Sequence, residues 1–363
     1  MDEGMKNKEE RTRVAIDLGK RQSYFVVEKN GIAVREGYTP TNRRGFNDFL
    51  CDVEEGSRVI IEACGATDRV SRFLEGYDVV VVHPYKVRVI AESLKKTDRH
   101  DTHFLLDLDR LGQLPLAWMP DEKTRRNRDL CRNRYFLVKQ RTAVKIRIKD
   151  YAYRLGMDFE SFSERRLKIL KALNNPILSV LISRLDELNK NVKEMDGLIH
   201  SAYLDDPNAK LIDTIPGFAE YASLAVSSEL GDASRFSDVH KLFAYAGMVP
   251  GVRQSGDYER HGRMIRGNSF LKYILIECTT THLRCCDSRL TKGYYRMLPR
   301  TGRINAKIGT ARRILGVMYY MIKRGERFDP DYGRETSSYD LSLKDAHTFD
   351  APIPNRMENL SAA

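Results

Sequence analysis

The sequence predicts three parts: an α/β N-terminal domain with a mixed sheet covered by helices, a central helical segment, and a mostly α-helical C-terminal domain. Short β-branched runs alternate with helical patterns up to about residue 111, an order that is typical of a mixed sheet. Helical periodicity runs from about 122 to 200, and a Gly-, Pro- and Arg-rich loop at 247–268 precedes further helices. The 363 residues leave room for about two domains of ~150 residues each.

The N-terminal elements follow from local signals in chain order. Asn30-Gly31 between two β-branched runs is a strong hairpin signal. Pro84 suits the first turn of a helix, and Thr97 suits the N-cap of the next one, which we expect to end near Leu111. We expect strands at Arg13–Asp17, Ser23–Glu28, Ile32–Glu36, Arg58–Glu62 and Val79–Val82, and helices at 42–53 and 67–74.

The central segment carries a heptad pattern, in which apolar residues step alternately by three and four positions. Two interpretations fit this pattern. We favour a coiled coil that joins two subunits; the alternative is an amphipathic helix that packs on its own chain. The stepped residues are Leu178, Leu181, Leu185, Leu188, Val192, Met195 and Ile199.

The C-terminal part is predicted to be helical around one turn and one loop. Pro216-Gly217 lies between two predicted helices and resembles a helix–hairpin–helix turn, with an ordinary connection as the default interpretation. Further helices are expected at 269–286 and 306–323. The resulting domains are 1–12 (polar leader), 13–118 (α/β domain), 119–205 (basic helix and coiled coil), 206–330 (C-terminal domain) and 331–363 (flexible tail).

Composition argues against several classes of protein. No apolar run approaches the ~18 residues that a membrane helix needs, and the first residues lack the apolar segment of a signal peptide. None of the six cysteines forms a Cys-x-x-Cys pair, which argues against a disulfide scaffold or a zinc ribbon. We therefore expect reduced thiols in a cytoplasm.

Positive charge is concentrated in two blocks. Residues 121–154 hold twelve Lys or Arg against four Asp or Glu, and 253–313 hold fourteen against four, in a chain of net charge +11. Such blocks indicate a surface for the phosphate backbone of nucleic acid, with a solvated helix face as the alternative. The second block is interleaved with Tyr273, Tyr294, Tyr295 and His282. The candidate contacts are Arg125, Arg126, Arg128, Arg253, Arg260, Arg263 and Arg266.

Four carboxylates stand where strands and a helix can bring them together. Asp17 and Glu62 each end a predicted strand, and Asp98 and Asp101 share a face at a helix start. Oxygen ligands suit Mg²⁺ or Mn²⁺, and a pair of ions about 3.5–4 Å apart is usual for displacement at phosphorus. Alternatively, Asp17 is a turn residue and the helix dipole favours the Asp pair. At the same helix start we interpret two histidines as exposed residues and not as ligands: His100 and His103.

Several short blocks resemble the DEDD transposases of insertion-sequence family 110, whose first domain is RuvC-like with an RNase H fold. In the first half the similar blocks are Ala15–Gly19, Ile61–Gly65 and Lys96–Asp101. In the second half they are Thr214–Gly217, Ser228–Asp232, Arg235-Phe236, Ala246–Pro250 and Ser255-Gly256, in the order of the family's C-terminal transposase domain. The resemblance covers about residues 13–330. Departures from the family's usual residues stand at Cys64, His83 and Arg266 and leave substrate preference open.

The resemblance implies a transposase or site-specific recombinase of a prokaryotic insertion sequence. The family's metal-binding acids carry over onto Asp17, Glu62, Asp98 and Asp101, and its serine nucleophile onto Ser255. The implied chemistry is attack of Ser255 on a DNA phosphodiester, which leaves a phosphoserine bond and a free 3′-hydroxyl. Without the resemblance, Ser255 would be interpreted as a turn residue, because no activating partner lies in its own loop.

The same resemblance implies the partners. They are donor and target DNA, an element-encoded bridge RNA that pairs with both, and Mg²⁺ or Mn²⁺, as two ions. A homo-oligomer, a dimer or a tetramer, would assemble active sites across subunits. The implied location is a prokaryotic cytoplasm in association with the nucleoid, with no membrane partner.

Three other interpretations are considered. A metal-only nuclease resembling Holliday-junction resolvases would use the acids without Ser255. An actin/hexokinase-type ATPase would share Asp17-Leu-Gly19, but it predicts a second Asp-x-Gly turn and an adenosine site that the sequence lacks. A nucleic-acid-binding protein with a decayed site is disfavoured, because all five candidate catalytic residues are present.

Overall fold

The computed structural model describes residues 12–90, 97–159, 161–255 and 258–331, and the side chains of all of these except 88–90, 252–255, 258–261 and 263. The chain divides between Met119 and Pro120 into two compact units, called the N-terminal and the C-terminal unit, and each is described by itself. Among the described helices, none combines the length and the apolar character needed to cross a lipid bilayer.

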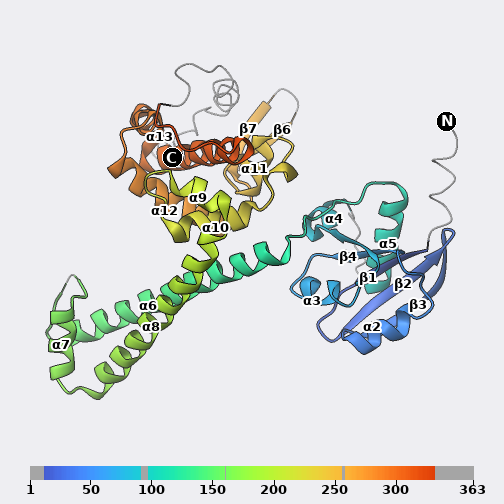
Figure 1. Ribbon diagram of the computed structural model, residues 1–363, viewed down its shortest axis with the longest axis horizontal. Coiled ribbons are helices and arrows are strands. Elements are labelled where there is room, and N and C mark those ends of the chain that lie inside the picture. The colour runs from blue at the N-terminus through green and yellow to red at the C-terminus, as the bar shows by residue number, and fades with distance from the viewer. Residues whose placement is uncertain (1–11, 91–96, 160, 256–257, 332–363) are drawn as a thin grey trace, which may run out of the picture. The chain divides into compact units, whose positions relative to one another are not determined.

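The N-terminal unit is built on a mixed five-stranded sheet in the order β3-β2-β1-β4-β5 (Figure 1). β1 is antiparallel to β2, and β2 to β3, whereas β4 is parallel to β1 and β5 to β4. The strands are β1 (Arg13–Asp17), β2 (Gln22–Lys29), β3 (Ile32–Pro40), β4 (Arg58–Glu62) and β5 (Asp78–Val82). This sheet confirms the predicted α/β domain of RuvC-like type.

Helices cover both faces of the sheet, as Figure 1 shows. Along β1, Val14 and Ile16 join an apolar cluster with Phe46 of α2, whereas Ala15 joins another with Leu105 of α5. The alternation follows from the period of two along a strand. The helices are α2 (Arg43–Leu50), α3 (Thr67–Ser71), α4 (Pro84–Ile90) and α5 (Asp98–Arg110).

Three elements of this unit end three or four residues from the predicted position, and one of them is α2, which ends at Leu50 instead of residue 53. β3 continues past the predicted end at Glu36 to Pro40, because it pairs with β2 as far as Gln22. A proline is tolerated there because β3 is an edge strand that ends at this residue. α3 ends three residues before the predicted Leu74. The predicted cap is confirmed: the Thr97 hydroxyl accepts from the backbone N–H of residue 100 at 3.2 Å.

The C-terminal unit begins with an antiparallel helical hairpin. It consists of α6 (Glu122–Arg154), α7 (Glu164–Ala172) and α8 (Pro176–Leu204), and Figure 1 shows α6 and α8 side by side with α7 at the far end. The Lys123 Nζ donates to the Asp205 carbonyl oxygen at 2.7 Å, so the start of α6 meets the end of α8. An ion pair between Arg134 and Asp196 lies further along the hairpin.

Five of the seven heptad residues of α8 are buried within a single chain, whereas Leu181 and Met195 are half-buried. Leu178, Leu185, Leu188 and Val192 are at most 3% exposed. At the far end of the hairpin the α8 residues share an apolar cluster with Ile148 of α6. Apolar surface that α6 already removes from water cannot be buried a second time by another subunit. The structure therefore favours the interpretation in which this helix packs on its own chain.

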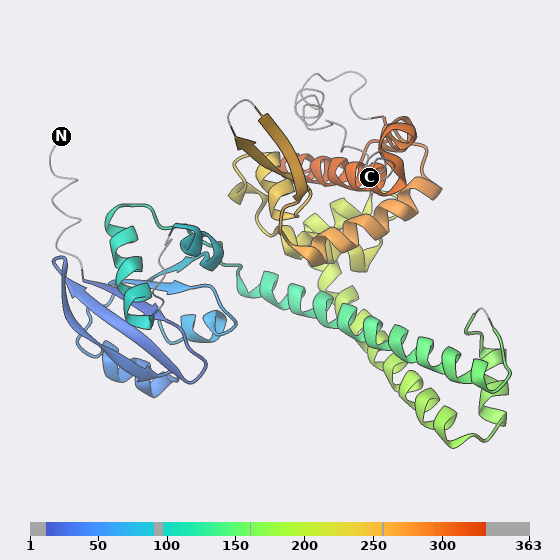
Figure 2. The same ribbon diagram turned by 180° about the vertical axis from the view of Figure 1, so that it is seen from behind.

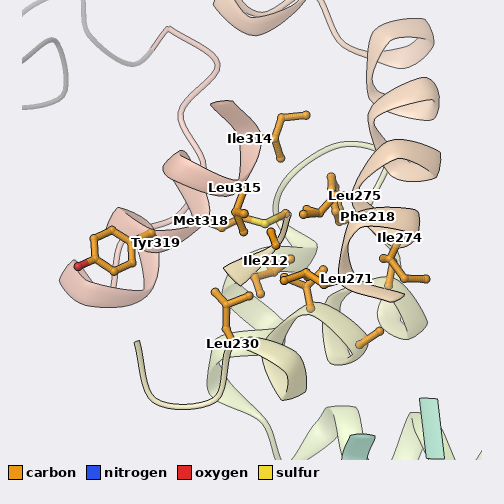
Figure 3. Packing of buried hydrophobic residues seen from close by; sticks show 14 of the residues in the cluster. Ile212, Phe218, Leu230, Leu271, Ile274, Leu275, Ile314, Leu315, Met318 and Tyr319 are labelled. Atoms are coloured by element: carbon orange, nitrogen blue, oxygen red, sulfur yellow. The ribbon is translucent and has the colours of Figure 1, made fainter. Parts of the chain in front are cut away.

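The rest of the C-terminal unit is a helical bundle with one β-hairpin, shown from behind in Figure 2. Its core draws on α9, α10, α12 and α13, and Figure 3 shows residues such as Ile212, Leu230, Leu275 and Met318 packed together. The elements are α9 (Pro207–Asp213), α10 (Glu220–Leu230), the 3₁₀-helix η1 (Ala233–Arg235), α11 (Val239–Tyr245), β6 (Pro250–Ser255), β7 (Tyr258–Met264), α12 (Ser269–Cys285) and α13 (Arg289–Arg324).

α13 begins well before the predicted start at 306 and is kinked at Gly302, where the backbone leaves the helical region (φ 75°). Two residues that the sequence grouped with nucleic-acid contacts are buried near it. His282 is fully buried, with its Nδ1 2.7 Å from the Pro216 carbonyl oxygen and its Nε2 2.9 Å from the Ser288 hydroxyl, and Tyr294 is 8% exposed. Both residues belong to the packing of the bundle.

The Pro216-Gly217 turn packs directly on α12. Gly217 has a positive φ of 97°, and a Cβ there would lie 2.6 Å from the backbone nitrogen of His282. Only glycine fits this close approach between two backbones. The default interpretation, an ordinary connection between helices, accounts for the turn.

Candidate active site and nucleic-acid interface

Asp17 and Glu62 lie at one edge and on one face of the sheet. β1 and β4 pair in parallel, in the register that makes these two residues neighbours at the carboxyl ends of the strands. Each stands two positions beyond a residue of the cluster that faces α5, Ala15 in β1 and Ile60 in β4. Because side chains alternate along a strand, both acids face α5, and both are half-buried.

The turns that follow the two strands are held by close backbone contacts. A Cβ at Gly19 would lie 2.0 Å from the Gln22 carbonyl oxygen, so only glycine fits the turn after β1. The Thr67 hydroxyl accepts from the Cys64 backbone N–H at 2.7 Å and donates to the Glu62 carbonyl oxygen at 3.2 Å. These contacts fix the backbone that carries the two acids.

α5 runs antiparallel to β1 and β4, which places its first turn at the same edge. Near its C-terminal end, Asp109 pairs with the first residues of both strands, with Arg13 at 3.3 Å and Arg58 at 2.9 Å. A helix of this length spans about 20 Å and a five-residue strand about 17 Å. Asp98 and Asp101 therefore reach the edge where β1 and β4 end.

Tyr38 links β3 to this group of acids. Its hydroxyl donates to the Asp98 Oδ2 at 3.2 Å. Desolvation raises the pKa of the Tyr38 phenol, and the Asp98 and Asp17 carboxylates raise that pKa further. Two of the four acids thus lie around one phenol. The sequence prediction missed Tyr38, because the predicted strand stopped at residue 36; continued β-branched or aromatic residues through Tyr38 and Thr39 were the available signal.

His103 is half-buried and bonded to Glu36, whereas the sequence predicted it as exposed. Its Nε2 lies 2.7 Å from the Glu36 Oε2, and Arg99 lies 2.6 Å from the other carboxylate oxygen. The hydrogen bond from His103 lowers the pKa of the Glu36 carboxyl, and the positive charge of Arg99 lowers it further. The second histidine, His100, is exposed as predicted.

The donor chemistry of the four acids fits a hard divalent cation. All are carboxylates on one face and one edge of the unit, and such oxygen ligands suit Mg²⁺ or Mn²⁺. In the part of the chain that the structure describes, no three His, Cys, Asp or Glu side chains form a cluster that could hold a metal ion. To share an ion, the carboxylates of the four acids would have to lie closer together than they do in this structure.

Ser255 is placed by the backbone of the β6–β7 hairpin. It is the last residue of β6 and pairs with Tyr258, the first residue of β7. Arg253 pairs with Arg260 in the same ladder, and Arg263 lies near the end of β7. Gly256, which belongs with Ser255 to the last of the blocks that resemble the family, and residue 257 lie outside the described residues.

The first basic block splits into different environments. Arg126 is exposed and Arg125 is half-buried. The guanidinium of Arg128, by contrast, donates from Nε to the Ser228 carbonyl oxygen at 2.7 Å and from its other end to the Glu229 carbonyl oxygen at 3.0 Å. Arg128 thus satisfies carbonyl groups at the end of α10, which have no partner within the helix. These contacts give Arg128 a structural role, and its binding of nucleic acid stays a prediction.

A buried carboxylate organises the charges around α10. Glu229 is fully buried and accepts a bidentate pair from Arg132 at 2.7 and 3.0 Å. Asn268 donates to the same carboxylate at 2.7 Å and also caps α12. Bidentate pairs of this kind fix orientation as well as charge. The sequence prediction did not single out Arg132 or Glu229, because their separation of 97 residues leaves no local signal.

A pocket of about 590 Å³ lies between α6 and the start of α12. Basic and aromatic side chains of α6 border it on one side, and the loop after β7 borders it on the other. Arg266, the last of the predicted nucleic-acid contacts, is exposed on that loop. The lining residues are Arg132, Tyr135, Lys139, Gly267, Asn268, Ser269 and Phe270.

Two models of protein families match separate parts of the chain. The DEDD transposase model of the IS110 group matches residues 14–153, which include all four acids of the N-terminal unit. The model described as "Transposase IS116/IS110/IS902 family" matches residues 209–296, which include Ser255 and the β6–β7 hairpin.

Curated relatives are similar over different lengths. The transposase for insertion sequence element IS1111A of Coxiella burnetii is 23% identical over 291 residues, which cover 74% of this chain and 79% of that protein. The y4qE protein of Sinorhizobium fredii is 26% identical over 219 residues, 57% of this chain. An uncharacterized protein of insertion element IS116 from Streptomyces clavuligerus is 28% identical over 41% of this chain. The match spans about half (53%) of the y4qE protein and 38% of the IS116 protein.

Proposed function

This chain belongs to the IS116/IS110/IS902 family of DEDD transposases, and on that premise we propose that it cuts and rejoins DNA strands through a serine nucleophile. The observation that carries the proposal is the common edge and face of Asp17, Glu62, Asp98 and Asp101. The two family models, which cover these acids and Ser255 separately, support the same proposal.

The four acids are proposed to hold Mg²⁺ or Mn²⁺, as two ions. When bound, the ions supply Lewis-acid stabilisation of charge on the phosphate oxygens and lower the pKa of a bound hydroxyl. The chain's own contribution is to place the acids: β1 and β4 carry Asp17 and Glu62, and the first turn of α5 carries Asp98 and Asp101. Tyr38 orients Asp98 by donating to its Oδ2.

Ser255 is proposed to attack the phosphorus of a DNA phosphodiester. Its Oγ forms the new P–O bond and loses its proton, while the 3′-oxygen of the cleaved strand leaves and takes up a proton. The phosphoserine bond retains the energy of the phosphodiester, so the strand can be joined to a new partner without ATP. Arg253, Arg260 and Arg263 of the same hairpin, with Arg266 beyond it, are proposed to hold phosphate oxygens.

The proposed partners are donor and target DNA, a bridge RNA as the source of sequence specificity, and further copies of the chain in a dimer or tetramer. Two basic blocks without a sequence-reading motif support a guide of this kind, since phosphate contacts position a protein but do not read sequence.

The experiment is to trap the covalent intermediate on a cognate substrate. Wild-type protein should carry a DNA adduct that resists denaturant and maps to Ser255. Ser255→Ala should abolish the adduct and strand exchange while DNA binding survives, because only the hydroxyl is removed. Ser201→Ala is the matched control: it removes an exposed hydroxyl of α8 and should leave the adduct unchanged.

If Ser255→Ala cleaves DNA at the wild-type rate, water is the nucleophile, and the chain acts as a metal-only nuclease of the resolvase type. In that case the four acids would still be required for cleavage. The experiment therefore tests the role of Ser255 separately from the metal site.

A further inference from the structure

We propose that the exposed face of the first half of α13 binds single-stranded DNA. The face consists of three basic residues, Lys292, Arg296 and Arg300, called the basic row, and of Tyr295 beside them. The inference rests on the proposed function, because exchange of strands between duplexes leaves strands unpaired.

The sequence around the basic row is free of acidic residues. From 288 to 325 there are ten Lys or Arg and no Asp or Glu. A solvated helix face usually carries both signs of charge, because pairs three or four residues apart stabilise the helix. A stretch of one sign creates a strong local field that attracts phosphate groups.

The row lies opposite the packed face of the helix. At 100° per residue, positions 292, 296 and 300 fall within about 80° of one another. All three side chains are exposed, whereas Leu290 and Met297 on the other side are 1% and 4% exposed. The basic row therefore faces solvent along its whole length.

The charges of the row are not neutralised by the described residues. Within the chain that the structure describes, the Arg296 and Arg300 side chains have no ion pair or hydrogen bond, and Lys292 lies 3.7 Å from an exposed Asp287. Exposed pairs of that kind contribute little. Arg132, by comparison, is held by a buried carboxylate. The positive charge of Arg132 is therefore neutralised inside the fold, whereas the charges of the basic row remain available to an external anion.

The spacing of the row suits the phosphates of one DNA strand, whether paired or unpaired. Residues four apart on a helix are about 6 Å apart along its axis, which is close to the rise of two nucleotides, about 7 Å per strand. Successive side chains of the row can therefore meet alternate phosphates of one strand.

Tyr295 selects for unpaired bases. It is 59% exposed, and its ring meets the buried Tyr294 edge to face at 5.3 Å, which fixes its position. A base can stack on an exposed ring only when its face is free, as in a single strand. A duplex offers phosphates but keeps its base faces stacked. The pairing of a basic row with an exposed ring thus favours a single strand over a duplex.

The test measures binding of the full chain to three fluorescent probes of one sequence: a single-stranded oligodeoxynucleotide, its duplex, and the matching oligoribonucleotide. Replacing the row (Lys292→Gln, Arg296→Gln and Arg300→Gln together) should lower the salt slope for the single strand by about 2, at ~0.7 per lost contact. The matched control removes the same charge from α7, at the exposed Arg165, Arg166 and Lys168, and should leave the slope unchanged.

The second part of the test concerns the Tyr295 ring and uses the variant Tyr295→Leu. Its control is Tyr153→Leu, because Tyr153 is an exposed tyrosine of α6 (69% exposed). Tyr295→Leu should weaken single-strand binding about fivefold or more and leave duplex binding unchanged, as expected for one lost stacking contact. Equal losses in the α7 control, no loss in Tyr295→Leu, or losses of duplex or RNA binding in the row variant as large as its loss of single-stranded DNA binding would overturn the proposal. Binding needs no catalysis, so a missing Ser255 adduct would overturn the proposed function alone.

Discussion

Arg126 and Arg128 stand two positions apart on α6, yet their side chains serve different purposes. Arg126 is exposed, whereas Arg128 donates to carbonyl oxygens at the end of α10. The same contrast separates the buried Glu229, which Arg132 neutralises, from the exposed acids of the helical hairpin. At the scale of single residues, the partner within the fold decides whether a charge is available to a ligand.

This contrast gives a prediction for the first basic block. Arg125→Gln with Arg126→Gln should weaken duplex binding and lower the salt slope by about 0.9 per lost contact. Arg128→Gln should leave the slope unchanged but destabilise the C-terminal unit, by roughly 1–3 kcal/mol for carbonyls that lose a charged donor. Salt titrations and urea unfolding separate the two effects. An unchanged slope in the double variant would identify this face as merely solvated.

The four acids give a second prediction at this scale. Asp17→Asn, Glu62→Gln, Asp98→Asn or Asp101→Asn should each abolish strand cleavage and leave DNA binding largely intact, because each removes a proposed ligand and no basic residue. Cleavage in Mg²⁺ and gel-shift binding are the two measurements.

The control for the acids is Glu75→Gln, which removes one exposed carboxylate from the same unit. It should cleave at the wild-type rate. Near-normal cleavage by Glu62→Gln would remove that residue from the site, even if the other three variants are inactive.

At the scale of elements, the pairing of α6 with α8 decides what the heptads mean. The heptad residues of α8 are equally compatible with a coiled coil between subunits and with helix packing inside one chain. The short α7 connects α6 to α8 so that the two helices run antiparallel. The apolar residues of α8 therefore pack against α6 of the same chain. A hairpin within the chain also costs less entropy, because its two helices are already connected.

Leu185→Ala should therefore lower the stability of the C-terminal unit by about 2–5 kcal/mol, the usual cost of a cavity at a fully buried leucine. Val180→Ala, at a position of α8 that is 70% exposed, should change it by less than about 0.5 kcal/mol. Urea unfolding checks both. If Leu185→Ala instead forms a smaller assembly in light scattering without losing stability, the heptad residues make a contact between subunits.

At the scale of the whole molecule, the two units carry different halves of the proposed chemistry. The acids belong to the N-terminal unit, and Ser255 belongs to the C-terminal unit. In the proposed mechanism both halves are required, because the Ser255 hydroxyl is the nucleophile and needs the ions held by the acids for its activation. The family resemblance implies that the halves meet across subunits.

Mixing two inactive variants tests this assembly. Asp17→Asn retains Ser255, and Ser255→Ala retains all four acids. If active sites form across subunits, the mixture should regain strand cleavage, because some sites then combine an intact N-terminal unit with an intact C-terminal unit. Each variant alone should stay inactive in the same assay. An inactive mixture, under conditions where subunits exchange, would place both halves of each site on one chain.

The sequence by itself determined the elements whose signals are local. Asn30-Gly31 marked a hairpin, Thr97 marked a helix start, and the boundaries of Arg13–Asp17 and Arg58–Glu62 were confirmed. The four acids could be chosen because strand ends and a helix start are local features. The period of the strands predicts the face of Asp17 and Glu62 within each strand, whereas the pairing of β1 with β4 and the direction of α5 came from the fold. The roles of the acids and of Ser255 came from the family resemblance and stay predictions.

Only the tertiary structure decided which distant residue meets which. Tyr38 reaches Asp98 across 60 positions, and Arg132 reaches Glu229 across 97. Periodicity shows that a face is apolar or charged but not what covers it, because burial depends on the packing of elements far apart in the chain. For this reason the sequence identified the heptads and the basic blocks, whereas the fold assigned α8 to its own chain and Arg128 to the end of α10.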